Sequence, residues 1–294
     1  MKVGVFGQFY HDGSEEYVLT LLEVLGEKGI EVIVEAKYLE LIRHFLDGKR
    51  TYATFSSFDD LDSGCDMFFS MGGDGTILRT VLYIRDLGIP VLGINTGRLG
   101  FLATVQKENI RQAVDSIIRG EYDVVDRTLL EINTNPENKD LTELNFALNE
   151  VAVNRKDTTS MITVATYLND EYLTSYWADG LIIATPTGST GYSLSCGGPV
   201  LTPDTTGFVL TPIAPHNLNA RPLVIPDDTV IKLKVSGREP NYLVSLDSRL
   251  ATLTEETEII IQKAPFTMKM IELRAESFLK TLRNKLLWGE DRRN

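Results

Sequence analysis

The chain has 294 residues, is 43% hydrophobic and carries a formal net charge of −12, which allows two ordinary domains and argues against general nucleic-acid binding. No apolar run reaches the ~18 residues of a membrane span, the N-terminus has no signal-peptide architecture, and two cysteines are too few for a disulfide framework. We therefore expect a cytoplasmic globular protein that binds small ligands and neither nucleic acid nor a membrane.

The first part of the chain alternates strand-like and helix-like segments. Alternation of this kind predicts a parallel sheet, and such sheets bind ligands at the carboxyl ends of their strands. The segments in chain order are a strand at 2–6, a helix at 14–27, a strand at 30–35, a possible helix at 39–46, a strand and helix within 66–87, a strand at 88–95 and a helix near 110–119.

The sequence Gly-Gly-Asp-Gly-Thr at 72–76 directly follows a buried strand at 67–71. Glycines lack the Cβ atoms that keep a ligand away from the backbone, so their N–H groups can approach phosphate oxygens closely. A helix starting near Thr76 would point its positive end at the same place. The pattern predicts a phosphate loop made of Gly72, Gly73, Gly75 and Thr76.

Asp74 within this loop would repel a phosphate unless the chemistry requires a carboxylate. In phosphoryl transfer to a hydroxyl group, such a carboxylate can accept the proton of the attacking oxygen or help to hold Mg²⁺. The alternative is that Asp74 only caps the following helix, and the motif alone leaves both interpretations open. The chain contains no Walker-type loop, and Leu78 stands where a Rossmann fingerprint requires a small residue.

Beyond the helix near 110–119 the pattern changes to short β-type runs separated by turn residues, which predicts a second, mostly antiparallel domain. A final helical stretch near 276–287 has an apolar stripe that must pack against the first domain or another subunit. We predict an α/β domain with a parallel sheet over 1–124, a β-rich substrate-binding domain over 125–270, and a C-terminal segment over 271–294 that returns to the α/β domain. The candidate strands of the second domain are 127–133, 144–154, 162–168, 172–177, 180–184, 208–213, 222–225, 229–235, 242–246 and 258–262.

Two stretches of the second domain carry candidate binding residues. Asn149 and Glu150 lie in an apolar strand, where an unpaired charge is costly, so they either bind a polar ligand or end the strand facing water. Residues 185–195 are rich in glycine and hydroxyl side chains and follow a buried strand, with Asp179 before it. Hydroxyls and backbone amides bind ribose and phosphate oxygens without adding charge, which favours a pocket floor over a plain loop.

Other polar residues give weaker signals. Arg221 and Asp247 could contact a ligand or form salt-bridged turns. His11, His44 and His216 show no metal-ligand spacing with one another or with the cysteines, so we predict no protein-bound metal site.

Four segments in this order, 72–76, 95–101, 149–150 and 185–195, closely resemble those of bacterial NAD kinases (ATP-NAD kinases), and the likeness runs through nearly the whole chain. The Gly-Gly-Asp-Gly loop is shared with phosphofructokinases and lipid kinases, but the Thr-Pro-Thr-Gly-Ser-Thr and Asn-Thr-Gly-x-Leu-Gly-Phe stretches are more specific. The resemblance implies Mg²⁺-dependent transfer of phosphate from ATP to the 2′-hydroxyl of the adenosine ribose of NAD, giving NADP, by a homodimer or homotetramer.

The resemblance also implies roles for individual residues. Asp74 matches the proton acceptor and Asn149 with Glu150 matches a pair that holds a ribose. The other positions expected to bind NAD are Gly75, Arg79, Phe101, Asp179, Thr187, Thr190, Gly191, Tyr192, Ser193, Leu194 and Ser195. Gly191 stands where relatives usually have alanine, Arg249 where glutamine is common, and Ser160 or Trp177 where some place a basic residue.

Two other functions compete with this interpretation. A lipid or sugar kinase shares the Gly-Gly-Asp-Gly loop, but a lipid kinase predicts an apolar acceptor pocket, whereas residues 185–195 are rich in hydroxyls. A dinucleotide-sensing binding protein would tolerate loss of the base, yet Asp74 is present.

Overall fold

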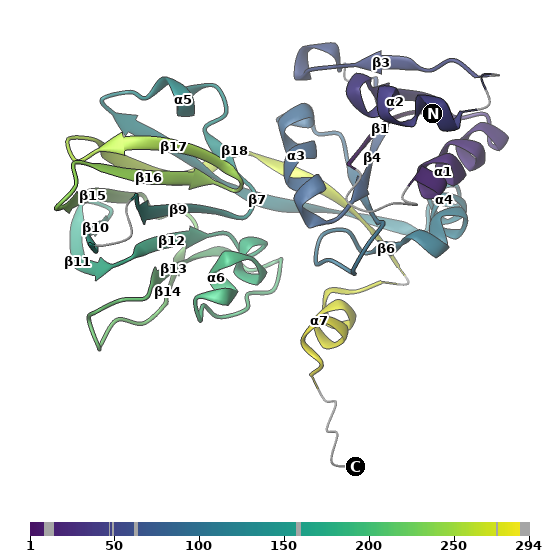
Figure 1. The fold of residues 1–294 in the computed structure, drawn as a ribbon. Coiled ribbons are helices and arrows are strands. Elements are labelled where there is room, and N and C mark those ends of the chain that lie inside the picture. The colour runs from purple at the N-terminus through teal and green to yellow at the C-terminus, as the bar shows by residue number, and fades with distance from the viewer. Residues whose placement is uncertain are drawn as a thin grey trace. The chain divides into compact units, whose positions relative to one another are not determined.

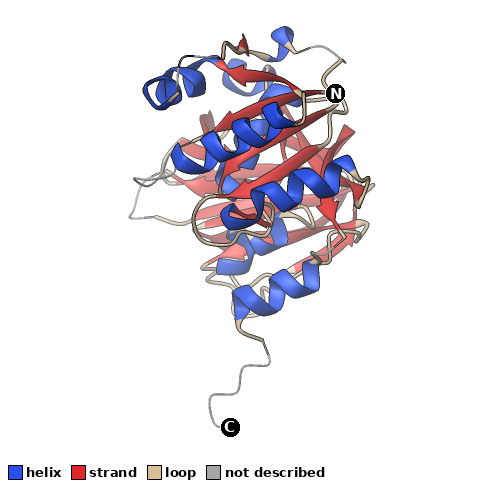
Figure 2. Cartoon of the chain, turned by 90° about the vertical axis from the view of Figure 1, so that its right-hand side faces the viewer, coloured by secondary structure: helices blue, strands red, loops and turns tan. Residues whose placement is uncertain are grey.

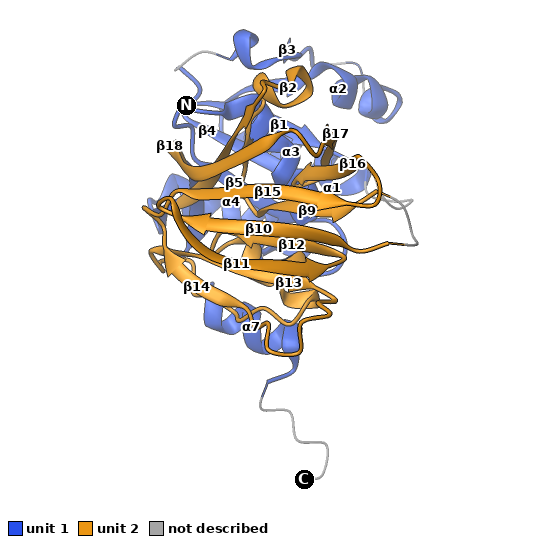
Figure 3. Ribbon diagram, turned by 90° about the vertical axis from the view of Figure 1, so that its left-hand side faces the viewer, with its two compact units in different colours: residues 1–126, 268–294 blue, residues 127–267 orange. Residues whose placement is uncertain are grey.

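The computed structural model describes residues 1–8, 15–46, 48, 50–61, 64–156, 160–274 and 276–288, so His11 lies outside the described residues. The chain divides into two compact units, Met1–Asp126 with Met268–Asn294 and Arg127–Thr267 (Figure 3). Within the described ranges, no helix is long and apolar enough to cross a membrane.

The first unit contains a parallel sheet with strand order β5-β4-β1-β2-β3, with helices lying across the strands (Figures 1 and 2). The short β6 also pairs with β5, as does Met270 near the end of β18. The elements are β1 Lys2–Gly7, α1 Glu15–Glu27, β2 Glu31–Glu35, α2 Ala36–Ile42, the 3₁₀ turn Arg43–Phe45, β3 Ala53–Phe55, the 3₁₀ turn Phe58–Asp60, β4 Met67–Gly72, α3 Asp74–Ile84, β5 Val91–Asn95, β6 Val105–Gln106, the 3₁₀ turn Lys107–Asn109, α4 Ile110–Ile118 and α7 Phe278–Leu286.

Burial explains why these segments form a layered α/β unit. Strands β4 and β5 are buried along their whole lengths, as expected for parallel strands covered on both faces. Helix α1 buries one apolar stripe that includes Leu21 and Leu25, and α4 buries Val114 and Ile117. These side chains join those of the strands in one core.

The second unit consists of two mostly antiparallel sheets that share one apolar core (Figure 3). One sheet has the order β14-β13-β12-β9-β16-β17, and the other includes β11-β10-β15-β18 with β7 and β8. The elements are β7 Tyr122–Asn135, α5 Lys139–Thr142, β8 Phe146–Ala147, β9 Glu150–Arg155, β10 Ile162–Leu168, β11 Glu171–Ala178, β12 Gly180–Ala184, the 3₁₀ turn Gly188–Thr190, α6 Tyr192–Ser195, β13 Gly207–Ile213, β14 Leu223–Pro226, β15 Ile231–Gly237, β16 Asn241–Leu246, β17 Arg249–Thr254 and β18 Glu258–Leu273.

The predicted fold class is confirmed: an α/β unit with a parallel sheet, a β-rich antiparallel unit, and a C-terminal helix that belongs to the first unit. Several strand predictions were wrong in detail. The strand expected over 144–154 is interrupted between β8 and β9, and β7 and β18 extend well beyond the expected 127–133 and 258–262. Strands β3, β6 and β17 were missed. Asp247 causes the interruption, because its side chain takes the backbone N–H groups that a continuous strand would use.

Candidate active site

Asp74 is the first residue of α3, and its carboxylate is held by a neighbouring loop. Oδ2 accepts a hydrogen bond from the backbone N–H of Phe101 at 2.8 Å, and Oδ1 accepts from Leu102 at 2.9 Å and Ala103 at 3.0 Å. Gly73 at the N-cap supplies no side-chain hydrogen bond. Asp74 therefore connects the start of α3 to the loop after β5, and the interpretation as a simple helix cap is wrong.

The loop that holds Asp74 is shaped by Asn95 at the end of β5. The Asn95 amide donates to the carbonyl of Arg98 at 2.7 Å, and its Oδ1 accepts from the N–H of Gly97 at 2.8 Å. Gly100 lets this loop approach the Asp74 side chain closely, because a Cβ at position 100 would lie 1.9 Å from Oδ1 of Asp74. The segment 95–103 thus holds the carboxylate, with its three donors at 101–103.

The predicted phosphate loop lies at the carboxyl ends of β4 and β5 within the first unit. The N-terminus of α3 lacks a side-chain cap. The N–H of Thr76 donates to the carbonyl of Gly73 at 2.9 Å, so the amides of Asp74 and Gly75 are the ones that can face an anion. Oγ1 of Thr76 is buried and has no hydrogen-bond partner among the described residues. Gly75 is exposed at the first turn of α3, and Arg79 is exposed one turn further along.

Phe101 presents its backbone to Asp74 and its ring to the C-terminal helix. The ring lies 6.2 Å from that of Phe278, and Nζ of Lys285 lies 5.4 Å above it. Lys285 also donates to the carbonyl of Leu99 at 2.6 Å. Helix α7 therefore supports the loop that holds Asp74.

In the second unit, Asn149 and Glu150 lie where β9 begins, and Asp247 fixes their backbone. Oδ1 of Asp247 accepts from Asn149 at 2.8 Å and Glu150 at 3.2 Å, while Oδ2 accepts from Leu148 at 3.0 Å. Oδ1 of Asn149 and Oε2 of Glu150 are buried and have no partner among the described residues. Glu150 is buried and Asn149 half-buried, so each holds a buried oxygen whose hydrogen-bonding capacity is unused among the described residues.

Burial determines the charge of this carboxyl group. Desolvation, and then the nearby negative charge of Asp247, raises the pKa of Glu150 to about 8, although a hydrogen bond from the backbone of Tyr192 opposes the shift. Burial also raises the pKa of Asp247, but its three amide donors and Arg249 oppose this. We assign the negative charge to Asp247 and the proton to Glu150 at neutral pH, because only Asp247 has several donors.

The turn after β12 packs directly against Asn149 through Thr185. Oγ1 of Thr185 donates to the carbonyl of Leu148 at 2.6 Å and accepts from the N–H of Gly188 at 3.0 Å, while its own N–H donates to Asn149. A Cβ at Gly188 would lie 2.0 Å from the carbonyl oxygen of Asn149. The glycine-rich sequence therefore allows two backbone segments to touch.

The residues expected to bind the dinucleotide in 185–195 are not equally available. Gly191 lies against Asn149 and Glu150, since a Cβ there would be 3.0 Å from Oε2 of Glu150 and 3.4 Å from Nδ2 of Asn149. Tyr192 is 42% exposed. By contrast, the Ser193 hydroxyl is buried and bonded to Thr211 at 2.8 Å, so its side chain is occupied internally.

The remaining predicted residues differ in their exposure and in their partners. Thr187 is buried and its carbonyl accepts from the hydroxyl of Thr190 at 3.0 Å, which stabilises the turn. Leu194 is half-buried and Ser195 exposed on α6. Asp179, between β11 and β12, forms an ion pair of 3.1 Å with Arg155 and is therefore partly neutralised.

For Asp247 the sequence left open a ligand contact or a salt-bridged turn, and it did not reveal that the side chain holds three backbone amides. Its importance comes from three amides almost a hundred positions earlier in the chain, and the only signal was an aspartate directly after an apolar strand. Arg249 was also noted without a role. Its guanidinium donates to the carbonyls of Leu144 and Phe146, which fixes the segment leading to Asn149.

The described residues contain no group of three or more histidine, cysteine, aspartate or glutamate side chains that could hold a metal ion. Both carboxylate oxygens of Asp74 are engaged by backbone amides. The donor set therefore does not fit a Mg²⁺ cage made by the protein alone, and Mg²⁺ commonly binds through substrate phosphates instead.

The sequence matches two family descriptions that together span most of the chain. The ATP-NAD kinase N-terminal domain matches residues 3–122, and the ATP-NAD kinase C-terminal domain matches residues 148–273. Among similar proteins, the NAD kinase of Christiangramia forsetii is 59% identical and that of Flavobacterium psychrophilum 58% identical over 294 residues, covering 100% of both chains in each case.

Solved structures share the fold. A yeast NADH kinase complexed with NADH superposes with a TM-score of 0.86 at 24% identity, covering 99% of this chain and 89% of that one. An NAD kinase from Archaeoglobus fulgidus in complex with ATP gives a TM-score of 0.74 at 27% identity, covering 98% and 99%.

Proposed function

The chain belongs to the ATP-NAD kinase family, and we propose that Asp74 is the general base with which it phosphorylates NAD. Membership confirms the family expected from the sequence motifs. The chain is an NAD kinase, a phosphotransferase that uses ATP as the phosphate donor. The proposed acceptor is the 2′-hydroxyl of the adenosine ribose, and the product is NADP.

The fixed carboxylate of Asp74 carries the proposal for the base. A hydroxyl that attacks phosphorus must lose its proton, and a carboxylate can accept it when it lies within hydrogen-bond reach. Three backbone amides orient Asp74, and the uncapped N-terminus of α3 beside it suits a phosphate. This arrangement combines a proton acceptor and an anion site in one loop.

Asn149 and Glu150 have a binding role in this proposal. A protonated Glu150 both donates and accepts hydrogen bonds, as the hydroxyl groups of a sugar do. The unpartnered oxygens of Asn149 and Glu150 would gain partners when a ribose binds, which favours the bound state. Gly191 and Tyr192 lie next to the pair, so we assign them to the same dinucleotide contact.

Mg²⁺ neutralises phosphate charge in reactions of this class. Because no protein cage was found among the described residues, we propose that Mg²⁺ arrives bound to the phosphates of ATP. Two free cysteines, Cys65 and Cys196, fit a reducing cytoplasm, and a homodimer or homotetramer is proposed from the family resemblance.

The direct test is to incubate the pure protein with ATP, Mg²⁺ and NAD and to measure NADP with an NADP-specific dehydrogenase. We expect NADP to form only when all three components are present. The position of the new phosphate is read by ³¹P and ¹H NMR of the product. A phosphate at any position other than the 2′-hydroxyl, or no NADP at all, would overturn the assignment.

A further inference from the structure

A cavity of about 400 Å³ lies in the first unit, and Asp74 is not among its lining residues. Its walls come from α4, from β6 and from the turn that follows β18. The volume falls within the roughly 300–1,000 Å³ of small-molecule sites. Val105 and Ala113 are buried and form an apolar floor, while Gln106 and Gln112 are exposed at its walls.

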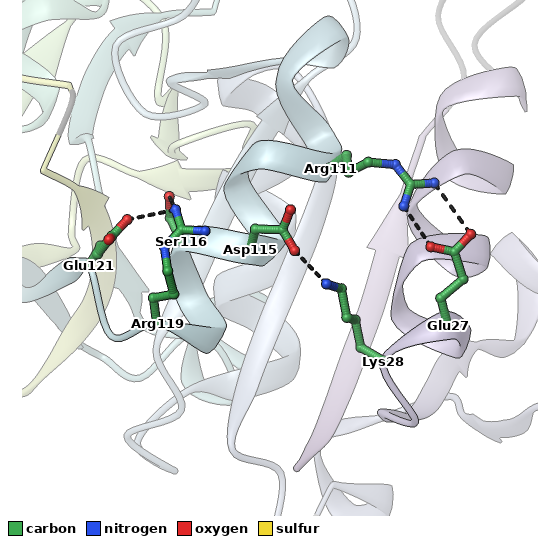
Figure 4. Close-up of polar contacts among 7 residues, drawn as sticks. All are labelled: Glu27, Lys28, Arg111, Asp115, Ser116, Arg119 and Glu121. Carbon is green, nitrogen blue, oxygen red and sulfur yellow. Dashed lines mark hydrogen bonds and ion pairs between the residues drawn. The ribbon is translucent and has the colours of Figure 1, made fainter.

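The charged residues of α4 that face α1 already have partners. Arg111 pairs with Glu27 at 2.5 Å, and Asp115 pairs with Lys28 at 2.6 Å (Figure 4). Arg119, which follows the last turn of α4, instead reaches toward the cavity. It binds Glu121 at 2.7 Å and Ser116 at 3.4 Å.

A second guanidinium group lines the same cavity and has weaker partners. Nε of Arg274 lies 3.9 Å from the carboxylate of Asp123, at the outer limit of an ion pair, and the Arg274 side chain is 62% exposed. A hydrogen bond from Arg119, and to a lesser extent the charge of Arg274, lowers the pKa of Glu121. Two cations therefore line the cavity, and one of them, Arg119, forms an ion pair with Glu121. The other acid there, Glu276, pairs with Lys280 at 3.1 Å.

We propose that this cavity is a regulatory site for a small organic anion bearing carboxylate or phosphate groups. Guanidinium groups bind both kinds of oxyanion through paired N–H donors. The two arginines would bind the anionic groups, and the amide side chains of Gln106 and Gln112 would bind hydroxyl or carbonyl oxygens. The apolar floor would accommodate a short carbon chain.

Two short connections join the cavity to the loop that holds Asp74, and this part of the inference rests on the proposed function. Val105 in the cavity floor lies two residues after Ala103, whose N–H donates to the Asp74 carboxylate. At the cavity wall, Glu276 leads into α7, where Phe278 packs on Phe101. A ligand that reorders the floor or this wall would shift the donors to Asp74.

The test measures binding and rate separately in the full-length protein. Isothermal titration calorimetry with tricarballylate, which carries only carboxylates, and with 3-phosphoglycerate, which adds a phosphate, shows which anion the cavity prefers. Glycerol is the neutral control. We expect at least one anion to bind, and Arg119→Gln and Arg274→Gln each to weaken its Kd at least tenfold. Arg283→Gln, an exposed charge change on α7 outside the cavity, should leave Kd unchanged.

The rate of NADP formation should change at least twofold when the anion is saturating, and Arg274→Gln should abolish this effect while keeping the basal rate. Bound NAD must alter the Kd of the anion by the same factor as the anion alters the Kd of NAD. The proposal would be overturned if no anion binds, or if Arg283→Gln weakens anion binding as much as the cavity variants do. It would also be overturned if the anion simply competes with NAD, or if it binds without changing the rate. Anion binding can still be measured by calorimetry if no NADP forms. Failure of the proposed function can therefore be told apart from failure of the proposed anion site.

Discussion

Glu150 and Asp247 hold each other through reciprocal hydrogen bonds. The N–H of Glu150 donates to Oδ1 of Asp247 at 3.2 Å, and the N–H of Asp247 donates to the carbonyl of Glu150 at 3.0 Å. The start of β9 and the turn after β16 are thereby locked together. Two buried carboxyl groups come close as a result. Only Asp247 has several hydrogen-bond donors that stabilise its negative charge.

Replacing Asp74 with asparagine should lower kcat for NADP formation by a factor on the order of 10² to 10⁴, the usual contribution of a general base. The amide retains an oxygen for Leu102 and Ala103 but turns its NH₂ toward the N–H of Phe101. We therefore also expect a loss of roughly 1–3 kcal/mol of stability, measured by thermal melting and urea unfolding.

The matched control for this loss of stability is Asn95→Ser, which weakens the same loop and leaves the carboxylate in place. At a comparable decrease in melting temperature, it should retain far more activity than Asp74→Asn. A folded Asp74→Asn enzyme with more than roughly a tenth of the wild-type rate would move the base elsewhere.

Glu150→Gln should raise KM for NAD more than it lowers kcat, because we assign Glu150 to binding and not to proton transfer. Glutamine keeps the size and the neutral charge of the protonated acid, so the variant should fold normally. Initial rates over a range of NAD concentrations separate the two constants. If kcat collapses while KM stays the same, Glu150 takes part in the chemical step.

The pH dependence of stability should also report on Glu150. Its pKa is raised from 4.5 to about 8 in the folded protein, so the folded state holds a proton that the unfolded chain releases. This stabilisation is complete below pH 4.5 and is lost as the pH rises through about 8. Glu150→Gln has no such proton, so its stability relative to wild type should increase by more than about 1 kcal/mol between pH 5 and pH 9. Urea unfolding at several pH values measures this difference, and a constant difference would contradict the buried, protonated state.

Asp247→Asn should affect both the backbone and the neighbouring acid. An asparagine oxygen can accept from Asn149 and Glu150, but its NH₂ then faces the N–H of Leu148. We expect a loss of roughly 1–3 kcal/mol in urea unfolding and a higher KM for NAD. The pKa of Glu150 should fall below about 8 because a negative neighbour has been removed. An unchanged pH profile of stability would show that Asp247 does not act on Glu150.

Deleting residues 276–294 should give insoluble or unfolded protein, because α7 supports the loop around Phe101. A milder test replaces Leu282, which is 5% exposed, with alanine, and should cost about 2–5 kcal/mol. Leu279→Ala on the same helix is the control, since Leu279 is 57% exposed and should change stability by less than about 0.5 kcal/mol. A soluble, fully active truncation would show that α7 is dispensable.

The sequence alone determined the fold class and the family, because these depend on local patterns. The buried run at 67–71 and the glycines after it are adjacent in the chain, so a strand followed by an anion-binding turn could be predicted directly. The hydroxyl-rich segment at 185–195 was recognised in the same way. Even here the local signal missed the short helix α6, whose four residues are too few for a helical period.

The tertiary structure decided what each polar side chain does, because the deciding partners lie far away in sequence. Asp74 could cap its own helix or serve another purpose until the amides of Phe101, Leu102 and Ala103 were seen to hold it. The interruption before β9 depends on Asp247, and the pKa of Glu150 is raised first by burial and then by the charge of Asp247. No periodicity of the sequence connects these residues. Hydrophobic patterns repeat along the chain, whereas a hydrogen bond between distant residues forms only after the core has brought them together.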